Sequence, residues 1–392
     1  MSKEQLWLRA SKGEIPCFRT DGDGSSMWRD LLGFDPTSSF VLKHVKELPA
    51  LLDYLEVNRD KLCSGYFSYD LGMALQGVTS RHSRQVPLAI IHTYENWVEY
   101  HQGQPHYVGF DPSDLNDEEP KLDSHPSIEF TLNISKTSYA KTITRIHEYI
   151  RAGDFYQLNY TQQLTGKTKD PVSYATMLNN HPAAYAMAMA GDELKIHSLS
   201  PELFLHHRNG ILTTEPIKGT RPRGANQQED DARRQELMSS EKEQAELFMI
   251  TDLLRNDLGK VSEIGSVALE AIRDMRKLPK VWHTYSRISG RLREDLKPVE
   301  ALLSMLPGGS ITGCPKKHAM EIIDELEDTP RGIYTGCMGY FHPDGDFSFN
   351  IAIRTLVQQA SKISLGSGGG ITIDSKWWDE WEELLAKAST FG

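Results

Sequence analysis

The sequence predicts an α+β protein: a two-lobed, mixed and largely antiparallel β-sandwich flanked by helices. Its strand-like runs follow one another through turns and do not alternate regularly with helical segments, as they would in a doubly wound parallel sheet. The turn Pro343-Asp344-Gly345 has the residues of a tight hairpin between two such runs. The chain has 392 residues, more than one hydrophobic core usually covers, so we expect two lobes.

The first 125 residues are predicted to form a small N-terminal lobe that ends in an acidic, proline-containing linker. Residues 48–55 have a helical pattern, and no strand is recognisable before Ser39. Residues 111–126 are polar, contain prolines and show no periodicity, which is typical of a linker. The larger second region then comprises residues 126–392.

The second region opens with an amphipathic helix and a strand. The helix carries an apolar stripe at intervals of four, three and four residues, with Ser138 as the expected N-cap and Gly153 as the expected end. Residues 155–164 form the expected strand, with Gln157 and Asn159 on one face. Later strands are expected at 211–214, 281–288, 336–341, 347–356 and 363–365.

Two pairs of glutamates far apart in the sequence could form a metal site. Glu243 and Glu246 lie at the start of a helix that a Ser-x-x-Glu pattern caps, and Glu380 and Glu383 lie in the last helix. Carboxylates three residues apart project from one helix face, about 5–6 Å from each other. If both pairs face one cavity their repulsion requires a cation, and Mg²⁺ is the economical choice. An ordinary solvated helix face is the alternative.

Two further residues are candidates for nucleophile and base. Lys218 follows an apolar strand in a predicted tight turn at 216–220, where a partly desolvated amine loses its proton more easily and can act as a nucleophile. An exposed loop lysine is the alternative. His283 lies in a strand among aromatic residues, where it is either a base or a hydrogen-bonded core residue.

Two glycine-rich segments and one arginine indicate anion binding. Residues 366–370 hold four glycines in five positions, which implies close approach of the backbone to a ligand and free N–H groups for a carboxylate. Residues 307–313 repeat this pattern before another helix, whose N-terminus favours an anion. Arg354 could pair with a second carboxylate or form a structural salt bridge. Together these features indicate a small polyanionic substrate; flexible loops are the alternative.

Composition excludes several classes of protein. The chain has 43 basic and 54 acidic residues, a formal charge of −11 and no long basic stretch, which argues against nucleic-acid binding. The N-terminus lacks the apolar core of a signal peptide, and no run of roughly 18 apolar residues occurs, so we expect a cytoplasmic protein without membrane contact. Cys17, Cys63, Cys314 and Cys337 have no CxxC spacing, which argues against a zinc site and a disulfide framework.

Four long motifs, in this order, resemble the chorismate-binding enzymes, and most closely the component I chains of the aminodeoxychorismate synthases. The resemblance covers residues 135–388 and implies the fold of the anthranilate synthase component I chains. The motifs are PIKGTRPRG at 216–224, AELFMITDLLRNDL at 245–258, LPGGSITGCPKKHAMEII at 306–323 and GGGITIDS at 368–375.

Within this family the resemblance points to an ammonia-using member. Members that activate water carry a lysine where this chain has Gln157, and anthranilate synthases normally carry an alanine where it has Lys218. The implied reaction is Mg²⁺-dependent amination of chorismate at C4 to 4-amino-4-deoxychorismate, a step toward 4-aminobenzoate and folate. No glutaminase segment accompanies the motifs, so a separate glutamine amidotransferase subunit is implied, in a heterodimer. An anthranilate or 2-amino-2-deoxyisochorismate synthase is the alternative.

The resemblance also implies roles for individual residues. Lys218 would be the nucleophile, Glu202 the proton donor, and His283 an assisting histidine. Glu246 and Glu383 match direct Mg²⁺ ligands, with Glu243 and Glu380 acting through water. The implied substrate-binding residues are Gln157, Ser310, Thr312, Tyr334, Arg354, Gly369, Gly370 and Lys387.

Overall fold

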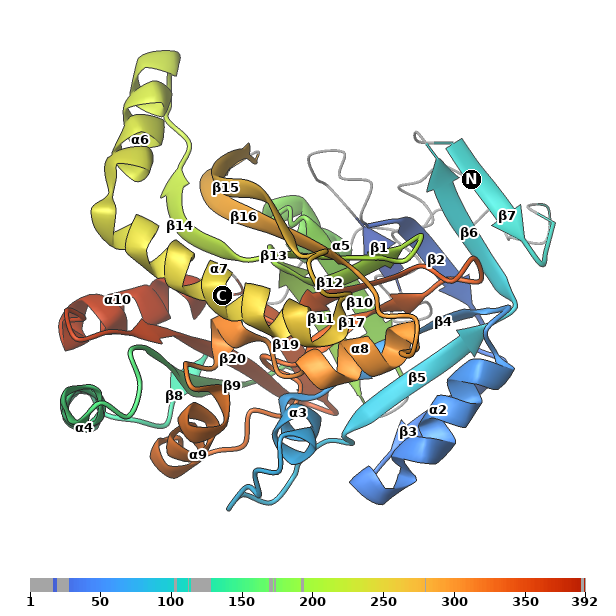
Figure 1. Cartoon of the computed structure of the whole chain (residues 1–392), viewed down its shortest axis with the longest axis horizontal. Coiled ribbons are helices and arrows are strands. Elements are labelled where there is room, and N and C mark those ends of the chain that lie inside the picture. The colour runs from blue at the N-terminus through green and yellow to red at the C-terminus, as the bar shows by residue number, and fades with distance from the viewer. Residues whose placement is uncertain are drawn as a thin grey trace.

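Two ten-stranded antiparallel sheets, with helices on their outer faces, make up the protein, as Figure 1 shows. This computed structural model describes residues 17–19, 28–101, 104–111, 113, 128–168, 172, 174–191, 194–278, 280–388 and 391. The predicted α+β class and antiparallel sandwich are confirmed. No helix within the described ranges is both long and apolar enough to cross a membrane.

The first sheet joins strands from both ends of the chain. Its order is β7 (Gln104–Val108), β6 (Asn96–His101), β2 (Asp30–Phe34), β1 (Cys17–Arg19), β10 (Tyr185–Ala190), β11 (Lys195–Ser200), β19 (Thr355–Gln359), β20 (Lys362–Ile371), β9 (Leu158–Lys167) and β8 (Thr131–Leu132). The long β9–β20 ladder is in register over ten residue pairs, from Leu158 opposite Ile371 to Lys167 opposite Lys362. This ladder forms the floor of the cavity described below.

The second sheet mixes early and late strands in the same way. Its order is β14 (Ile217–Pro222), β16 (Val281–Arg291), β13 (Ile211–Glu215), β12 (Leu203–Arg208), β18 (Phe347–Ile351), β17 (Cys337–Phe341), β4 (Leu62–Phe67), β5 (Ala89–Tyr94) and β3 (Ser38–Leu42), with β15 (Ala268–Lys277) pairing β16 outside this path. The predicted hairpin turn at 343–345 joins β17 and β18. Gly65 of β4 pairs with Gly339 of β17, which are 274 residues apart in the sequence.

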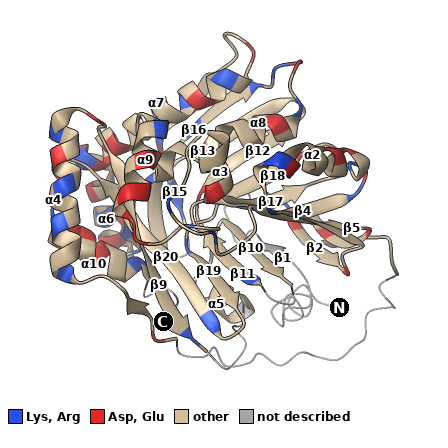
Figure 2. Cartoon of the chain, turned by 90° about the horizontal axis from the view of Figure 1, so that it is seen from below, with Lys and Arg blue, Asp and Glu red and all other residues tan. Residues whose placement is uncertain are grey.

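The main helical elements of the described chain are nine α-helices and two 3₁₀ turns. They are η1 (Val45–Glu47), α2 (Leu48–Val57), α3 (Tyr69–Leu75), α4 (Lys136–Ala152), α5 (Tyr174–Asn180), α6 (Gln227–Ser239), α7 (Glu241–Val261), α8 (Pro298–Met305), η3 (Gly309–Ile311), α9 (Lys316–Leu326) and α10 (Trp377–Ala388), so that nine of them are α-helices and the numbering begins at α2. Charged residues of both signs lie along α4 and α10 (Figure 2).

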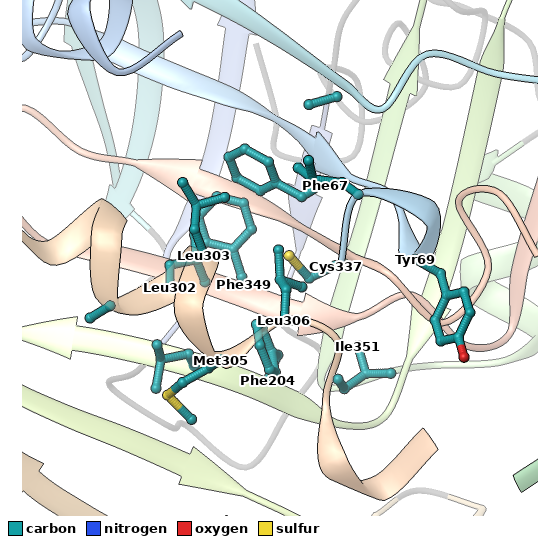
Figure 3. Close-up of a cluster of buried hydrophobic side chains, with 14 of the residues drawn as sticks. Phe67, Tyr69, Phe204, Leu302, Leu303, Met305, Leu306, Cys337, Phe349 and Ile351 are labelled. Carbon is teal, nitrogen blue, oxygen red and sulfur yellow. The ribbon is translucent and has the colours of Figure 1, made fainter. Parts of the chain in front are cut away.

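Separate apolar clusters hold these layers together. One lies between the sheets and combines Leu31 and Met187 of the first sheet with Tyr66 and Met338 of the second. Another lies between the second sheet and helices α2, α3, α7 and α8, and Figure 3 shows part of it around Phe349. Fully burying one large apolar side chain contributes about 1.5–3 kcal/mol to the stability of the fold. These clusters therefore stabilise the packing of strands from distant parts of the chain.

The N-terminal segment contributes strands to both sheets. β2 and β6 pair in the first sheet, while β3, β4 and β5 belong to the second. The expectation of no strand before Ser39 is wrong, because β1 and β2 precede it. The division of the sequence near residue 125 stays a prediction, and the two sheets do not follow that division.

Three local predictions change in the structure. The helix α4 is capped by Ser135, whose hydroxyl accepts a hydrogen bond from the backbone N–H of Ser138 at 3.1 Å, while Gly153 ends it with φ 87° as predicted. The predicted strand 347–356 is two strands in different sheets, because Arg354 adopts φ 46° between β18 and β19. The predicted strand 363–365 extends through the glycines, as β20.

Candidate active site

A cavity of about 470 Å³ lies where strands β14 and β16 of the second sheet meet strand β20 of the first, beside the helices α7 and α10. It is lined by residues from ten separate parts of the chain. The polar and charged residues of the lining are Asn159, Glu202, Lys218, Thr220, Arg221, Lys242, Glu243, Glu246, His283, Ser310, Tyr334, Arg354, Ser367, Glu380, Glu383 and Lys387. Pairs of residues up to 228 positions apart therefore face the same space.

Lys218 lies in the edge strand β14, not in the predicted turn. The pairing of β14 with β16 shifts between Lys218 and Thr220, which is a bulge centred on Gly219. Gly219 has φ 75°, and a Cβ there would lie 2.8 Å from Leu237 Cδ1 and 3.1 Å from Glu243 Oε2. Glycine is therefore required at this bulge, which directs Lys218 to the cavity and lets α7 pack closely.

The four predicted carboxylates all line this cavity. Ser240 caps α7 by accepting a hydrogen bond from the Glu243 N–H at 3.4 Å, so Glu243 and Glu246 are held in the first two turns. Burial raises the pKa of Glu246 and of Glu380. Burial also opposes ionisation of Glu383, but the Lys387 ammonium, 2.7 Å from Glu383 Oε1, outweighs this and lowers the pKa.

The carboxylate oxygens on α7 and α10 are suitable ligands for Mg²⁺, with water and substrate oxygens as its further ligands. In the part of the chain that the structure describes, no three Asp, Glu, His or Cys side chains lie close enough together to enclose a metal. Magnesium seldom needs such an enclosure, since it usually takes one or two carboxylates and keeps several waters or substrate oxygens. Glu246 and Glu383, on two helices that border one cavity, offer hard oxygen donors of this kind.

Glu202 is the most strongly perturbed acid of the cavity. It directly precedes β12, is buried, and its backbone N–H donates to Ser200 Oγ at 3.2 Å. Burial raises the pKa of Glu202 to about 7, although a hydrogen bond with Ser310 and the nearby Lys218 charge act in the opposite direction. About half of the Glu202 carboxyl groups therefore hold a proton at neutral pH, and this proton can be donated into the cavity.

His283 is a neutral imidazole opposite Thr220 in the β14–β16 pair. Its Nδ1 lies 2.9 Å from Thr220 Oγ1 across the β14–β16 pair, while its buried Nε2 has no hydrogen-bond partner among the described residues. Burial and the positive charges of Arg354 and Arg276 lower the pKa of His283 to about 3. The ring is therefore uncharged at physiological pH, and it can exchange a proton through Nε2.

The opposite wall offers groups that suit a carboxylate. Arg354 lies between β18 and β19, burial lowers its pKa, and no carboxylate of the described chain pairs with it. The glycines of β20 let neighbouring side chains pack directly on the strand, since a Cβ on Gly366 would lie 2.2 Å from the Tyr334 ring. A Cβ on Gly370 would lie 2.2 Å from Gln157 Nε2. An unpaired guanidinium beside a side-chain-free strand is a suitable place for an anion.

Most of the predicted site residues come together in this cavity, and two do not line it. Gln157 lies behind Gly370. Thr312 is buried, and its hydroxyl donates to the Gly308 carbonyl at 3.0 Å. The prediction did not include Asn159, Thr220, Arg221, Lys242 and Ser367 as site residues. Asn159 follows Gln157 at the strand period of two and could have been found by that spacing.

The sequence and the fold are both similar to those of known proteins. A family model described as "chorismate binding enzyme" matches residues 17–392. Anthranilate synthase component 1 of Acetivibrio thermocellus is 40% identical over 66% of this chain and 53% of its own length. The chloroplastic aminodeoxychorismate synthase of Arabidopsis thaliana is 36% identical over 98% of this chain and 49% of its own length. The chain thus spans about half the length of these curated relatives.

A solved structure extends the similarity over nearly the whole fold. The crystal structure of anthranilate synthase component I from Streptococcus pneumoniae TIGR4 superposes with a TM-score of 0.81 at 25% identity. The match covers 95% of this chain and 94% of that one. The arrangement of both sheets is therefore common to the two proteins.

Proposed function

The chain belongs to the family of chorismate binding enzymes, and from this premise we propose that it aminates chorismate at C4 to give 4-amino-4-deoxychorismate. Chorismate is a cyclohexadiene with two carboxylates and a C4 hydroxyl, and the cavity has a lysine, a protonated acid and cationic groups for such a ring. The convergence of Lys218, Glu202 and the helix carboxylates on one cavity carries the proposal.

The reaction would proceed through covalent catalysis by Lys218. In the first step the nitrogen lone pair of Lys218 adds to C2 of the ring, the double bonds shift, and the C4–O bond breaks. Glu202, whose pKa is raised to about 7 by burial, gives its proton to the departing oxygen, which leaves as water. Ammonia then attacks C4, the double bonds shift back, and the C2–N bond to Lys218 breaks. Two easier displacements replace one difficult step.

The carboxylates of α7 and α10 would hold the metal. Glu246 and Glu383 would bind Mg²⁺ directly, and Glu243 and Glu380 through water. When bound, the ion would neutralise a substrate carboxylate and act as a Lewis acid for charge that develops on the ring. In the structure Lys387 contacts Glu383, so this ion pair has to loosen when a cation takes its place.

The remaining cavity groups would orient the substrate. Arg354, which lacks an ion-pair partner in the described chain, and Tyr334 would hold the enolpyruvyl carboxylate together with the amide N–H of Gly370. Ser310, beside Glu202, would donate to a substrate oxygen. Lys387, whose ammonium also donates to the Gly368 carbonyl at 2.8 Å, and Gly369 complete this wall. Gln157 and Thr312 would act from behind it, by supporting Gly370 and the loop of Ser310.

A separate glutaminase subunit would supply the ammonia and form a heterodimer with this chain. The name of the bacterial relative, anthranilate synthase component 1, supports this, since it implies a second component. The amino product would then continue toward 4-aminobenzoate and folate in the cytoplasm.

Anthranilate formation is the second candidate. That reaction loses pyruvate and needs a base for the ring proton, and His283, with an unpartnered Nε2 at the cavity wall, is the imidazole placed to accept it. Relatives named anthranilate synthase component 1 support this reading as well. The two products differ in whether the enolpyruvyl group is retained.

Product identification separates the candidates. The protein is incubated with chorismate, Mg²⁺ and an ammonium salt, and the products are identified by mass spectrometry and fluorescence. A product that retains the enolpyruvyl group, and its absence with Lys218→Ala, supports C4 amination. Fluorescent anthranilate without an added lyase supports the second candidate. Consumption of chorismate by Lys218→Ala at the wild-type rate would exclude covalent catalysis by this lysine.

A further inference from the structure

A row of polar side chains leads along one face of β9 toward the catalytic cavity. Gln163, Thr161 and Asn159 lie at alternate positions of this strand, and alternate residues of a strand face the same side. Exposure falls along the row, because Gln163 is half-buried whereas Thr161 and Asn159 are buried. In the adjacent strand β20 the residues in register with them are Gly366, Gly368 and Gly370. The polar row therefore runs beside three glycines of β20, which have no side chains to cover it.

Two small cavities lie beside the outer part of this row. Their volumes are about 30 Å³ and 10 Å³, and Gln163 and Arg331 line both of them. Tyr334 and Gly366 also line both, and these two residues line the catalytic cavity as well. The Tyr334 ring on Gly366 therefore forms the partition between the small cavities and the large one.

The outer end of the row reaches the surface. Gln85, which is exposed, and Gln359 line the larger of the two small cavities. A hydrogen bond of 3.4 Å from Gln359 Nε2 to the Gln85 carbonyl joins the two sides of this end. A single long hydrogen bond between an exposed residue and a half-buried one is a weak closure.

The volume of these two cavities limits which molecules can enter them. One water requires about 10–15 Å³ of such space, and ammonia is a molecule of similar size. The two small cavities together therefore hold only a few molecules of this size, whereas a substituted six-membered ring needs the catalytic cavity of about 470 Å³.

The inner end offers a hydrogen-bonding group without a partner. The side chain of Asn159 is 8% exposed and makes no hydrogen bond with a described residue, and its Oδ1 is enclosed. Its backbone is held firmly, because its N–H donates to the Thr312 carbonyl and its carbonyl accepts from Arg331 Nη2, each at 2.7 Å. A buried amide oxygen without a partner is unfavourable, so a ligand with N–H groups would bind well here.

The wall of this row is rigid on the side of Arg331. This guanidinium is buried together with Glu327, at 2.7 Å, and Glu327 also accepts from the hydroxyl of Thr161 at 2.9 Å. A buried, fully bonded ion pair does not move easily. Movement of the Tyr334 ring is therefore the simplest way to connect the small cavities with the catalytic one.

We propose that the nitrogen nucleophile, as neutral ammonia, reaches the catalytic cavity along β9, past Gln163 and Tyr334, and is received by the side-chain amide of Asn159. This inference rests on the proposed amination, and it holds for either amino product. The wide cavity is large enough for the ring and carries Arg354, which pairs with no carboxylate of the described chain and can hold a carboxylate of the ring. Two entry routes let the ring and the nucleophile bind without blocking each other.

The test replaces Gln163 by tryptophan and measures steady-state kinetics with an ammonium salt as nitrogen donor. Gln163→Trp should raise the KM for ammonia at least tenfold and leave the KM for chorismate within about twofold. Gln359→Trp, at the outer end, is a second blocking variant should the first fail to fold, and thermal unfolding checks both. Thr165→Trp is the matched control, because Thr165 lies two residues farther along the same face and lines neither small cavity.

Three results would overturn the route. They are an unchanged KM for ammonia in both folded blocking variants, equal increases in the two KM values, and the same increase in Thr165→Trp. An Asn159→Leu variant should also raise the KM for ammonia more than that for chorismate, and the opposite order would contradict the role of the amide. If the wild-type protein forms no amino product, the proposed function itself fails and the route with it.

Discussion

Replacement of Glu202 by glutamine should change the pH dependence of both stability and activity. The carboxyl has an ordinary pKa of 4.5 and a folded-state pKa of about 7, raised by burial. Between these two values the folded protein binds a proton that the unfolded chain releases, so the stability of the wild-type protein falls as the pH rises through this window. Glutamine is neutral at every pH and removes this contribution.

The size of the effect follows from the two pKa values. A separation of about 2.5 pH units corresponds to about 3 kcal/mol, present in full below pH 4.5 and lost by about pH 7. Glu202→Gln should therefore gain stability relative to the wild-type protein by about 3 kcal/mol between pH 4.5 and pH 7.5. Urea unfolding of both proteins at several pH values measures this difference.

Activity should move in the opposite direction. If Glu202 protonates the departing oxygen, its loss should lower kcat by about 10²–10⁴-fold, and the wild-type rate should fall above about pH 7, where the carboxyl ionises. A stability difference between Glu202→Gln and the wild-type protein that is the same at pH 5 and pH 8 would refute the raised pKa. A variant with wild-type kcat would refute its role as the acid.

Three further predictions follow from other contacts. Gly219→Ala adds a Cβ 2.8 Å from Leu237 at φ 75°, so stability measured by thermal unfolding should fall by about 1–3 kcal/mol and kcat with it; an equally stable variant would contradict the strained bulge. Glu327→Gln leaves the buried charge of Arg331 unpaired and should cost about 3–5 kcal/mol in urea unfolding, and an unchanged midpoint would show that the pair is dispensable. Chelation should abolish turnover until Mg²⁺ is restored, and Mg²⁺ should raise the thermal midpoint of the wild-type protein but not of Glu246→Ala; an equal rise in both would place the ion elsewhere.

The sequence predicted those parts of the site that depend on local spacing. Glutamates three residues apart share a helix face wherever the helix lies, and Ser240 and Gly153 mark helix ends by chemistry that acts within a few residues. The turn at 343–345 likewise forms between strands that are adjacent in sequence. The resemblance to the chorismate-binding enzymes depended on such contiguous motifs and is confirmed by the family match.

The tertiary structure decided everything that depends on which segments meet. Lys218 belongs to a strand because β16, more than sixty residues away, pairs with it, and no local pattern contains that partner. The pKa of Glu202 is raised because distant elements exclude water from it. Asn159 is a site residue only because β9 lies next to the glycines of β20. Local spacing is a property of the chain, whereas burial, strand pairing and convergence arise from free-energy gains that many segments share once they pack together.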